Sequence, residues 1–166
     1  MSLIVSRRSC KSYTDKKISK DILDKILYAG ICAPSAKNLQ KTKLLVFQDK
    51  ELVHKLSKLN AKVLNSDIDP FYGAPIVVVV FYPSDASTGI QDASLVMGNL
   101  MNEATAQGVG SCWINRAKEM FELEEGKEIL KKYELENYVG VGCCILGEPK
   151  GEPKEKSIDT TRIIFG

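Results

Sequence analysis

The stretch PIVVVVFY, residues 75–82, decides the fold of this chain. Its run of β-branched and aromatic residues lacks polar alternation, which predicts a central strand covered on both faces. The run is also much too short to cross a bilayer, which takes ~20 apolar residues. The N-terminus has no apolar run of the kind that marks a signal peptide, so we expect a cytoplasmic protein with no membrane partner.

Helical and strand-like patterns extend outward from this strand on both sides. Ser19 caps a helix expected over 19–32, which Pro34 ends because its ring disfavours helical angles in the preceding residue. The other expected elements are a strand at 43–48, a short helix capped by Asp49, a long loop over 60–74, a core helix at 89–107, a strand within 108–115, one or two helices over 117–133 with a break near Gly126, and a last strand at 138–147. This order is typical of a parallel doubly wound sheet, yet neither GxGxxG nor GxxxxGK follows a strand, which counts against the usual nucleotide-binding folds.

The length and composition predict one domain over residues 1–166. The 166 residues are 44% hydrophobic, which is enough for one core and short for two. The composition changes abruptly after residue 147, so residues 147–166 are expected to form an extended tail with the apolar end Ile163, Ile164 and Phe165. Such a segment cannot pack on itself, and a second copy of the chain is the readiest surface for it.

Several classes of reaction and partner are disfavoured. The formal net charge of +2 provides no global field toward nucleic acid. His54, the one histidine, lies in a charged amphipathic helix, so neither a Ser/His/Asp hydrolase nor a metal site is expected.

Cys143 and Cys144 alternate faces of a strand, which indicates packing. Cys10 lies between basic residues, a setting that can make a thiol nucleophilic, but it has no acid/base partner nearby in the sequence. Packing, with the side chain pointing away from its neighbours, is favoured over thiol catalysis.

Three polar clusters are left to carry the function: RRSCKSY at 7–13, PSAKNLQ at 34–40 and SCWINR at 111–116. The first is compatible with a sorting signal, a nucleic-acid arm, a solvated basic end or a phosphate site. The second is rich in small groups and neutral amides, which can hydrogen-bond a flat heterocycle, and an ordinary Asn-rich loop is its alternative.

Taken together, the clusters resemble a known family. Followed in order with YGAPIVVVV at 72–80, ATAQGVGSCWIN at 104–115 and GEPK at 147–150, they resemble the nitroreductase family of FMN-dependent oxidoreductases, in its short form. The resemblance covers nearly the entire chain and depends on the order and spacing of the motifs. It implies an α+β nitroreductase-like fold with a mixed central sheet flanked by helices. It also implies a homodimer with two FMN molecules at the subunit interface and a C-terminal tail extending onto the partner subunit.

The resemblance also implies which residues bind the cofactor. The phosphate and ribityl chain are matched to Arg7, Arg8 and Ser9, and Lys11 is matched to a lysine near flavin N1 and O2, where it tunes the cofactor. The loop that reaches the flavin from the other subunit is matched by Pro34, Ser35, Ala36, Asn38 and Gln40. The strand end is matched by Ile114, Asn115 and Arg116, where the backbone N–H groups of the last two approach N5 and O4. Two tail residues, Lys154 and Lys156, are matched to the basic positions that complete the phosphate site.

The implied activity is hydride transfer from NADH or NADPH to flavin N5, followed by reduction of a nitroaromatic, a quinone or a similar flat acceptor in a ping-pong reaction. No side chain is expected to act as a covalent nucleophile. Phe71, Tyr72 and Trp113 are candidates for shaping the substrate pocket, with core or rim positions as their alternatives. A flavin-modifying enzyme, a non-catalytic flavin sensor and a nucleic-acid binder are the competing functions. The physiological acceptor and the choice between NADH and NADPH stay open.

Overall fold

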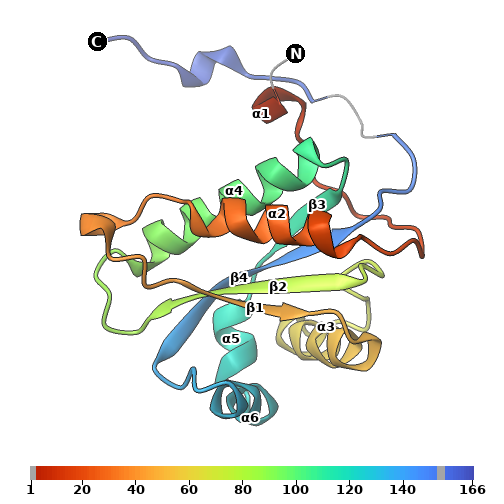
Figure 1. Ribbon diagram of the computed structural model, residues 1–166, viewed down its shortest axis with the longest axis vertical. Helices are drawn as coiled ribbons and strands as arrows, with labels where there is room; N and C mark the ends of the chain where they lie inside the picture. Colours follow the sequence, from red (N-terminus) through yellow and green to blue (C-terminus); the bar gives the residue numbers. More distant parts are fainter. Residues whose placement is uncertain (1–2, 153–155) are drawn as a thin grey trace.

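The computed structural model describes residues 3–152 and 156–166 as an α+β fold around a four-stranded sheet (Figure 1). The strands are β1 (Lys43–Phe47), β2 (Ile76–Pro83), β3 (Gly110–Ile114) and β4 (Tyr138–Gly147), and they lie in the order β1-β2-β4-β3. The predicted α+β class is confirmed. The predicted mixed sheet needs one correction, because all three strand pairs are antiparallel. The segment after β1 returns the chain to the same end of the sheet, so that Phe47 lies opposite Val77.

The strand predicted from PIVVVVFY is indeed central, with β1 on one side and β4 on the other. Val77 to Phe81 are 0% exposed, because alternate side chains enter two separate apolar cores. Cys143 belongs to one of these cores and Cys144 to the other, which confirms that the two thiols face opposite sides of the sheet. Burial raises the pKa of the Cys143 thiol to about 12, so both chemistry and charge are suppressed there.

Helices cover both faces of the sheet (Figure 1). On one face, α2 (Lys20–Ile31) packs against α4 (Gly89–Ala106) so closely that a Cβ on Gly30 would lie 2.7 Å from a Leu100 methyl. On the other face lie α3 (Lys50–Leu64), α5 (Ala117–Glu122) and α6 (Glu124–Lys132). Three short elements complete the described chain: α1 (Leu3–Ser6), η1 (Ala36–Asn38) and η2 (Thr160–Arg162).

The helix ends follow the predicted caps, with two differences. Ser19 caps α2 and Asp49 caps α3, as expected. However, α3 continues to Leu64, so the loop before β2 begins at residue 65 rather than 60. The break between α5 and α6 falls at Leu123, which is extended, rather than near Gly126. Gly126 instead lets α6 pack on α5, since a Cβ there would lie 2.2 Å from the Met120 carbonyl oxygen.

The C-terminal segment 156–166 runs away from the body of the domain (Figure 1). Its apolar residues are uncovered: Ile163 is 63% exposed, Ile164 90% and Phe165 91%. No described helix has the length and apolar character needed to span a membrane. Docking of the tail on a partner subunit stays a prediction, and the exposed apolar end is what such docking would cover.

Candidate functional site

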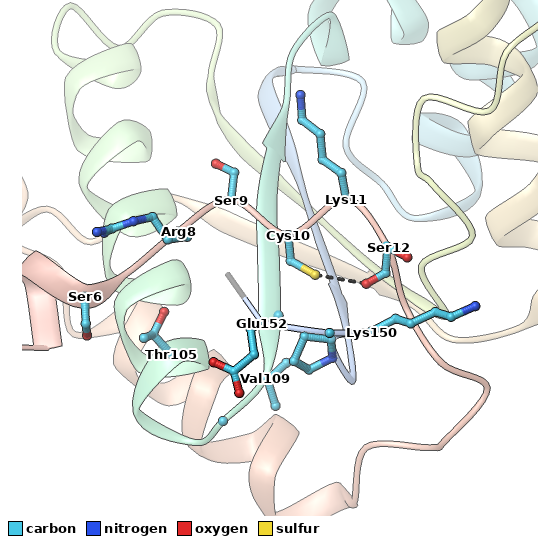
Figure 2. Close-up of a pocket in the computed structure, with 14 residues that line it drawn as sticks. Ser6, Arg8, Ser9, Cys10, Lys11, Ser12, Thr105, Val109, Lys150 and Glu152 are labelled. Carbon is cyan, nitrogen blue, oxygen red and sulfur yellow. Dashed lines mark hydrogen bonds between the residues drawn. The ribbon is translucent and has the colours of Figure 1, made fainter. Parts of the chain in front are cut away.

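A cavity of about 670 Å³ lies beside the first polar cluster (Figure 2). Its walls come from Ser6 and residues 8–12, from the end of α4 and its connection to β3, and from residues 149–152. Arg7 is not among the lining residues. Of the predicted site residues, Arg8, Ser9 and Lys11 line it. A volume of this size is typical of a small-molecule or cofactor site.

Backbone hydrogen bonds fix the cluster between β3 and the chain that follows β4. The Cys10 N–H donates to the Ser111 carbonyl oxygen at 2.8 Å, and Ser9 forms an isolated parallel bridge with Ser111. The Lys150 N–H donates to the Ser12 carbonyl oxygen at 2.9 Å. The Tyr13 hydroxyl donates to the Cys10 carbonyl oxygen at 2.7 Å. The cluster is therefore a docked segment of the fold and not a solvated basic arm.

Within this segment the side chains diverge (Figure 2). Ser9 and Lys11 point to one side, whereas Cys10 points to the other, where its thiol donates to the Ser12 carbonyl oxygen at 3.1 Å. Cys10 thus points away from Ser9 and Lys11, as expected, and its side chain lines the cavity. The side chain turns inward because Gly110 leaves room for it: a Cβ on Gly110 would lie 2.7 Å from the Cys10 sulfur.

Arg7 and Arg8 differ in what their guanidinium groups contact. Arg8 donates through Nη1 to the carbonyl oxygens of Val5 at 2.7 Å and of Arg7 at 2.8 Å. Arg7 holds a buried Nη1 that has no hydrogen-bond partner among residues 3–152 and 156–166. A buried guanidinium N–H left unpaired costs about 1–3 kcal/mol or more, so this donor awaits an acceptor. The charge and geometry of the group suit a phosphate.

Arg7, Ser9 and Lys11 gather around Cys112 on β3. Burial raises the pKa of the Cys112 thiol, while a hydrogen bond from Ser9 and the positive charges of Lys11 and Arg7 act in the opposite direction. Ser111, next to Cys112, has a buried hydroxyl oxygen without a partner among the described residues. The surroundings of β3 thus include two cations and a hydroxyl near Cys112, together with the Ser111 hydroxyl on the other face of the strand. Such groups fit an anionic, hydrogen-bonding ligand.

Lys11 is held by an aromatic ring at the turn before β2. Its Nζ lies 5.4 Å from the centroid of Tyr72, within the range of a cation–π contact. Asp69 shapes the turn by accepting the N–H groups of Phe71 at 2.9 Å and Gly73 at 2.7 Å. Tyr72 adopts a left-handed φ of 53° and stays exposed, whereas Phe71 is 1% exposed within the core. The packing favours a core role for Phe71, leaving Tyr72 as the pocket-shaping candidate of the two.

The second cluster lies at the other end of α2 from the first (Figure 1). At 1.5 Å per residue, the 12-residue α2 spans about 18 Å, so one chain does not bring residues 34–40 to its own cavity. Pro34, Asn38 and Gln40 are exposed there. The loop is nonetheless held in place, because the Ala36 N–H donates to Asp92 Oδ1 at 3.1 Å.

The loop also carries unusual backbone strain. Lys37, Asn38 and Gln40 have φ angles of 51°, 54° and 50°, which side-chain-bearing residues seldom adopt. The Gln40 N–H donates to Ser35 Oγ at 2.9 Å, and Gln40 Nε2 donates to Asn38 Oδ1 at 2.8 Å. Strain of this kind persists where the surroundings impose it and clusters at ligand-binding segments.

The third cluster follows β3. Ile114 is 6% exposed and faces the core, so only its backbone is available to a ligand. Trp113 is half-buried and packs against Gly142, where a Cβ would lie 2.4 Å from the indole Nε1. Asn115 is exposed, and Arg116 has a left-handed φ of 75°.

Sequence reasoning missed the residue that holds this cluster. Asn60, 0% exposed on α3, donates to the Asn115 carbonyl oxygen at 2.8 Å. Its side-chain oxygen accepts from Arg116 Nε at 3.1 Å and Nη2 at 2.9 Å. Asn60 follows the stripe Leu52, Val53, Leu56 and Leu59, so the available signal was a lone amide on the apolar face of a helix. Asp92 was missed likewise, although it is the one charged residue in α4 before Glu103.

The remaining predicted residues are on the tail. Lys154 lies outside the described residues. Lys156 is described and exposed. Among the described residues no group of three or more His, Cys, Asp or Glu side chains is arranged to hold a metal ion.

The chain matches one family of proteins over most of its length. The family model described as the Nitroreductase family matches residues 4–148, and the chain belongs to this family. A protein from Archaeoglobus fulgidus, provisionally named NADH dehydrogenase/NAD(P)H nitroreductase, is 33% identical over 161 residues, which cover 92% of this chain and 86% of that protein.

Two solved structures show the same fold. A nitroreductase from Bacteroides fragilis with bound FMN has a TM-score of 0.90 at 26% identity, covering 99% of this chain and 96% of that one. An FMN-dependent nitroreductase from Clostridium difficile R20291 has a TM-score of 0.84 at 29% identity, covering 98% of this chain and 96% of that one. The prediction of a nitroreductase-like fold is confirmed.

Proposed function

We propose that this protein is an FMN-dependent oxidoreductase that takes hydride from NAD(P)H and passes electrons to flat acceptors such as nitroaromatics and quinones. The cofactor proposal draws on the bound FMN of the Bacteroides fragilis nitroreductase and on the FMN dependence of the Clostridium difficile enzyme. The NAD(P)H proposal draws on the name of the Archaeoglobus relative. Both substrates use one site in turn, which implies ping-pong kinetics.

The observation that carries the proposal is the buried Nη1 of Arg7, which has no hydrogen-bond partner among the described residues. An arginine donor that the fold takes out of water without an internal partner is stabilised by an external anion. The FMN phosphate is such an anion. Ser9 and Ser111 supply neutral hydroxyls near the same strand, which suits a ribityl chain bearing hydroxyl groups of its own.

When bound, FMN supplies the two-electron chemistry, and the chain supplies binding, orientation and charge. In this proposal Lys11 would lie near the edge of the ring that becomes negative on reduction, where a fixed ammonium would raise the reduction potential. The contact with Tyr72 limits the motion of Lys11. Tyr72 and Trp113 then flank the space where a flat acceptor stacks.

The proposed active form is a homodimer. The loop 34–40 is too far from the cavity of its own chain, so it completes a site only in a second chain. The outer surfaces of α2 and α4 carry exposed apolar side chains, among them Tyr28 at 67% and Leu95 at 47%. Together with the exposed end of the tail, this apolar surface is more than a monomer normally leaves in water. A partner subunit would cover it and bring in the loop.

The direct test is to purify the protein and record its visible spectrum. We expect a yellow protein whose flavin absorbance bleaches anaerobically with NADH or NADPH and returns on addition of a quinone or nitroaromatic. The kinetics should show parallel double-reciprocal lines when both substrates are varied. A colourless protein that fails to take up added FMN would refute the proposal. Flavin that NAD(P)H leaves oxidised would point to a flavin-binding sensor instead.

A further inference from the structure

Among the described residues, the side chain of Asn60 makes four hydrogen bonds, all to the segment that follows β3. Its amide nitrogen reaches the Asn115 carbonyl oxygen at 2.8 Å and the Met120 sulfur at 3.0 Å. Its oxygen accepts two hydrogen bonds from Arg116, at 3.1 Å and 2.9 Å. With 0% exposure, the amide is fully removed from water and fully partnered.

The orientation of this amide follows from chemistry. Arginine is a donor only, so the atom that faces Arg116 has to be the amide oxygen. A carbonyl is an acceptor only, so the atom that faces Asn115 has to be the amide nitrogen. Both requirements are met by one orientation, and the flipped amide would place donors against donors and acceptors against acceptors.

This arrangement fixes the peptide plane between Asn115 and Arg116. The bond is trans, as are the other peptide bonds of the described residues. In a trans peptide the C=O and the N–H point in opposite directions. Because the Asn115 carbonyl points at Asn60 inside the core, the Arg116 N–H points away from the core. No acceptor for this N–H is present among residues 3–152 and 156–166.

The same contact leaves a positive charge without compensation. Arg116 is half-buried, and its side-chain hydrogen bonds go to a neutral amide. It forms no ion pair with a carboxylate of the described residues. An arginine partnered by Asn retains its full field, whereas an arginine partnered by Asp would be neutralised.

We propose that Asn60 is a positioning residue for the flavin, aiming the Arg116 N–H at the cofactor and keeping the guanidinium of Arg116 electrostatically active at the end of β3. The proposal deepens the proposed function and rests on it. Reduction adds negative charge to the flavin, so an uncompensated cation nearby favours the reduced form. A directed backbone N–H adds a hydrogen bond without the entropic cost of ordering a side chain.

Two substitutions separate the two proposed roles of Asn60, which are to orient the Arg116 N–H and to leave the charge of Arg116 uncompensated. Asn60→Asp keeps an acceptor for Arg116 but neutralises its charge and places a carboxylate oxygen against the Asn115 carbonyl. Arg116→Lys keeps the charge and removes the two-donor contact. We expect both variants to bind FMN about tenfold more weakly, the change that one lost hydrogen bond produces. We expect the midpoint potential to fall in Asn60→Asp and to stay near the wild-type value in Arg116→Lys.

Leu59→Ala is the matched control. It creates a defect in the neighbouring buried position of α3, 4% exposed in the wild type, without touching a polar partner of the 115–116 peptide. We expect it to lower the melting temperature while FMN affinity and midpoint potential stay at wild-type values. This control separates a loss of stability from a loss of positioning.

The outcomes are distinguishable. If wild-type protein binds no FMN, the proposed function fails. If wild-type protein binds FMN but Asn60→Asp has the wild-type dissociation constant and midpoint potential, this inference alone fails and Asn60 is a structural residue. If Asn60→Asp does not fold, Arg116→Lys decides: wild-type FMN affinity in that half-exposed substitution would also overturn the inference.

Discussion

Substituting Arg7 by alanine tests whether the basic segment is a phosphate site. The Nη1 of Arg7 is buried and unpaired among the described residues, whereas Arg8 beside it already donates to two carbonyl oxygens. If FMN phosphate is the missing acceptor, Arg7→Ala removes a charge-assisted hydrogen bond from the holoprotein. It removes no hydrogen bond between Nη1 and another described residue.

The expected changes in FMN affinity and in apoprotein stability follow from this difference between the holoprotein and the apoprotein. A hydrogen bond to a charged group contributes about 1.5–3 kcal/mol, which corresponds to a loss of FMN affinity of roughly 10- to 150-fold. The apoprotein should lose no stability by the same change, because an unpaired buried donor costs about 1–3 kcal/mol that the substitution relieves. Arg7→Ala should therefore weaken FMN binding strongly and leave the apoprotein melting temperature unchanged or higher.

The assay is titration of apoprotein with FMN, followed by quenching of flavin fluorescence, together with thermal unfolding of the apoprotein. Lys131→Ala is the charge-matched control, since it removes one positive charge from the end of α6, far from the cavity (Figure 1). We expect this control to bind FMN as the wild type does. Equal FMN affinity in Arg7→Ala and Lys131→Ala would refute the assignment of Arg7 to the phosphate, and a strongly destabilised Arg7→Ala apoprotein would show that Arg7 is partnered within the fold.

Three further predictions follow from the structure. Lys11→Ala should lower the midpoint potential of the bound flavin, measured by dye-coupled equilibration, with FMN affinity reduced less than in Arg7→Ala; an unchanged potential would remove Lys11 from the ring edge. Deletion of residues 150–166 should abolish both the dimer and FMN retention, measured by light scattering and absorbance, and a yellow, dimeric truncation would contradict the role of the tail. Burial raises the pKa of Cys143 from 9.0 to about 12, so between these values the unfolded thiol loses a proton that the folded thiol keeps. Stability should therefore fall as pH rises above about 9, by up to ~1.4 kcal/mol per pH unit for this thiol, and the fall should shrink in Cys143→Ala when urea unfolding is compared at several pH values.

Much of the fold was predictable because its main elements are locally determined. The uninterrupted apolar run at 75–82 specifies a strand buried on both faces, and Ser19 and Asp49 mark helix starts by chemistry confined to a few residues. The antiparallel pairing was not predictable in this way. It depends on where α3 and the segment after it return the chain, and that path is set by packing between distant residues.

The candidate site was likewise predictable only in part. The basic residues of the segment 7–11 can be recognised in the sequence, because like charges lie close together there. Which of the two arginines keeps a free donor is not visible, since it depends on Arg8 folding back onto nearby carbonyl groups. Asn60 was missed because a single amide in a helix has many ordinary explanations, and its partners Asn115 and Arg116 are more than fifty residues away.

The strained loop provides an independent reason to expect a second subunit. Left-handed φ angles at Lys37, Asn38 and Gln40 cost about 1–3 kcal/mol each, and an isolated loop would relax to avoid them. Hydrogen bonds with Asp92 and Ser35 order the loop, but they leave Leu39 more than half exposed. We infer that the loop is preorganised for a surface outside its own chain, since preorganisation lowers the entropy lost when such a surface binds. If that surface is the flavin site of a partner subunit, the loop's cost in the monomer is offset by affinity in the dimer.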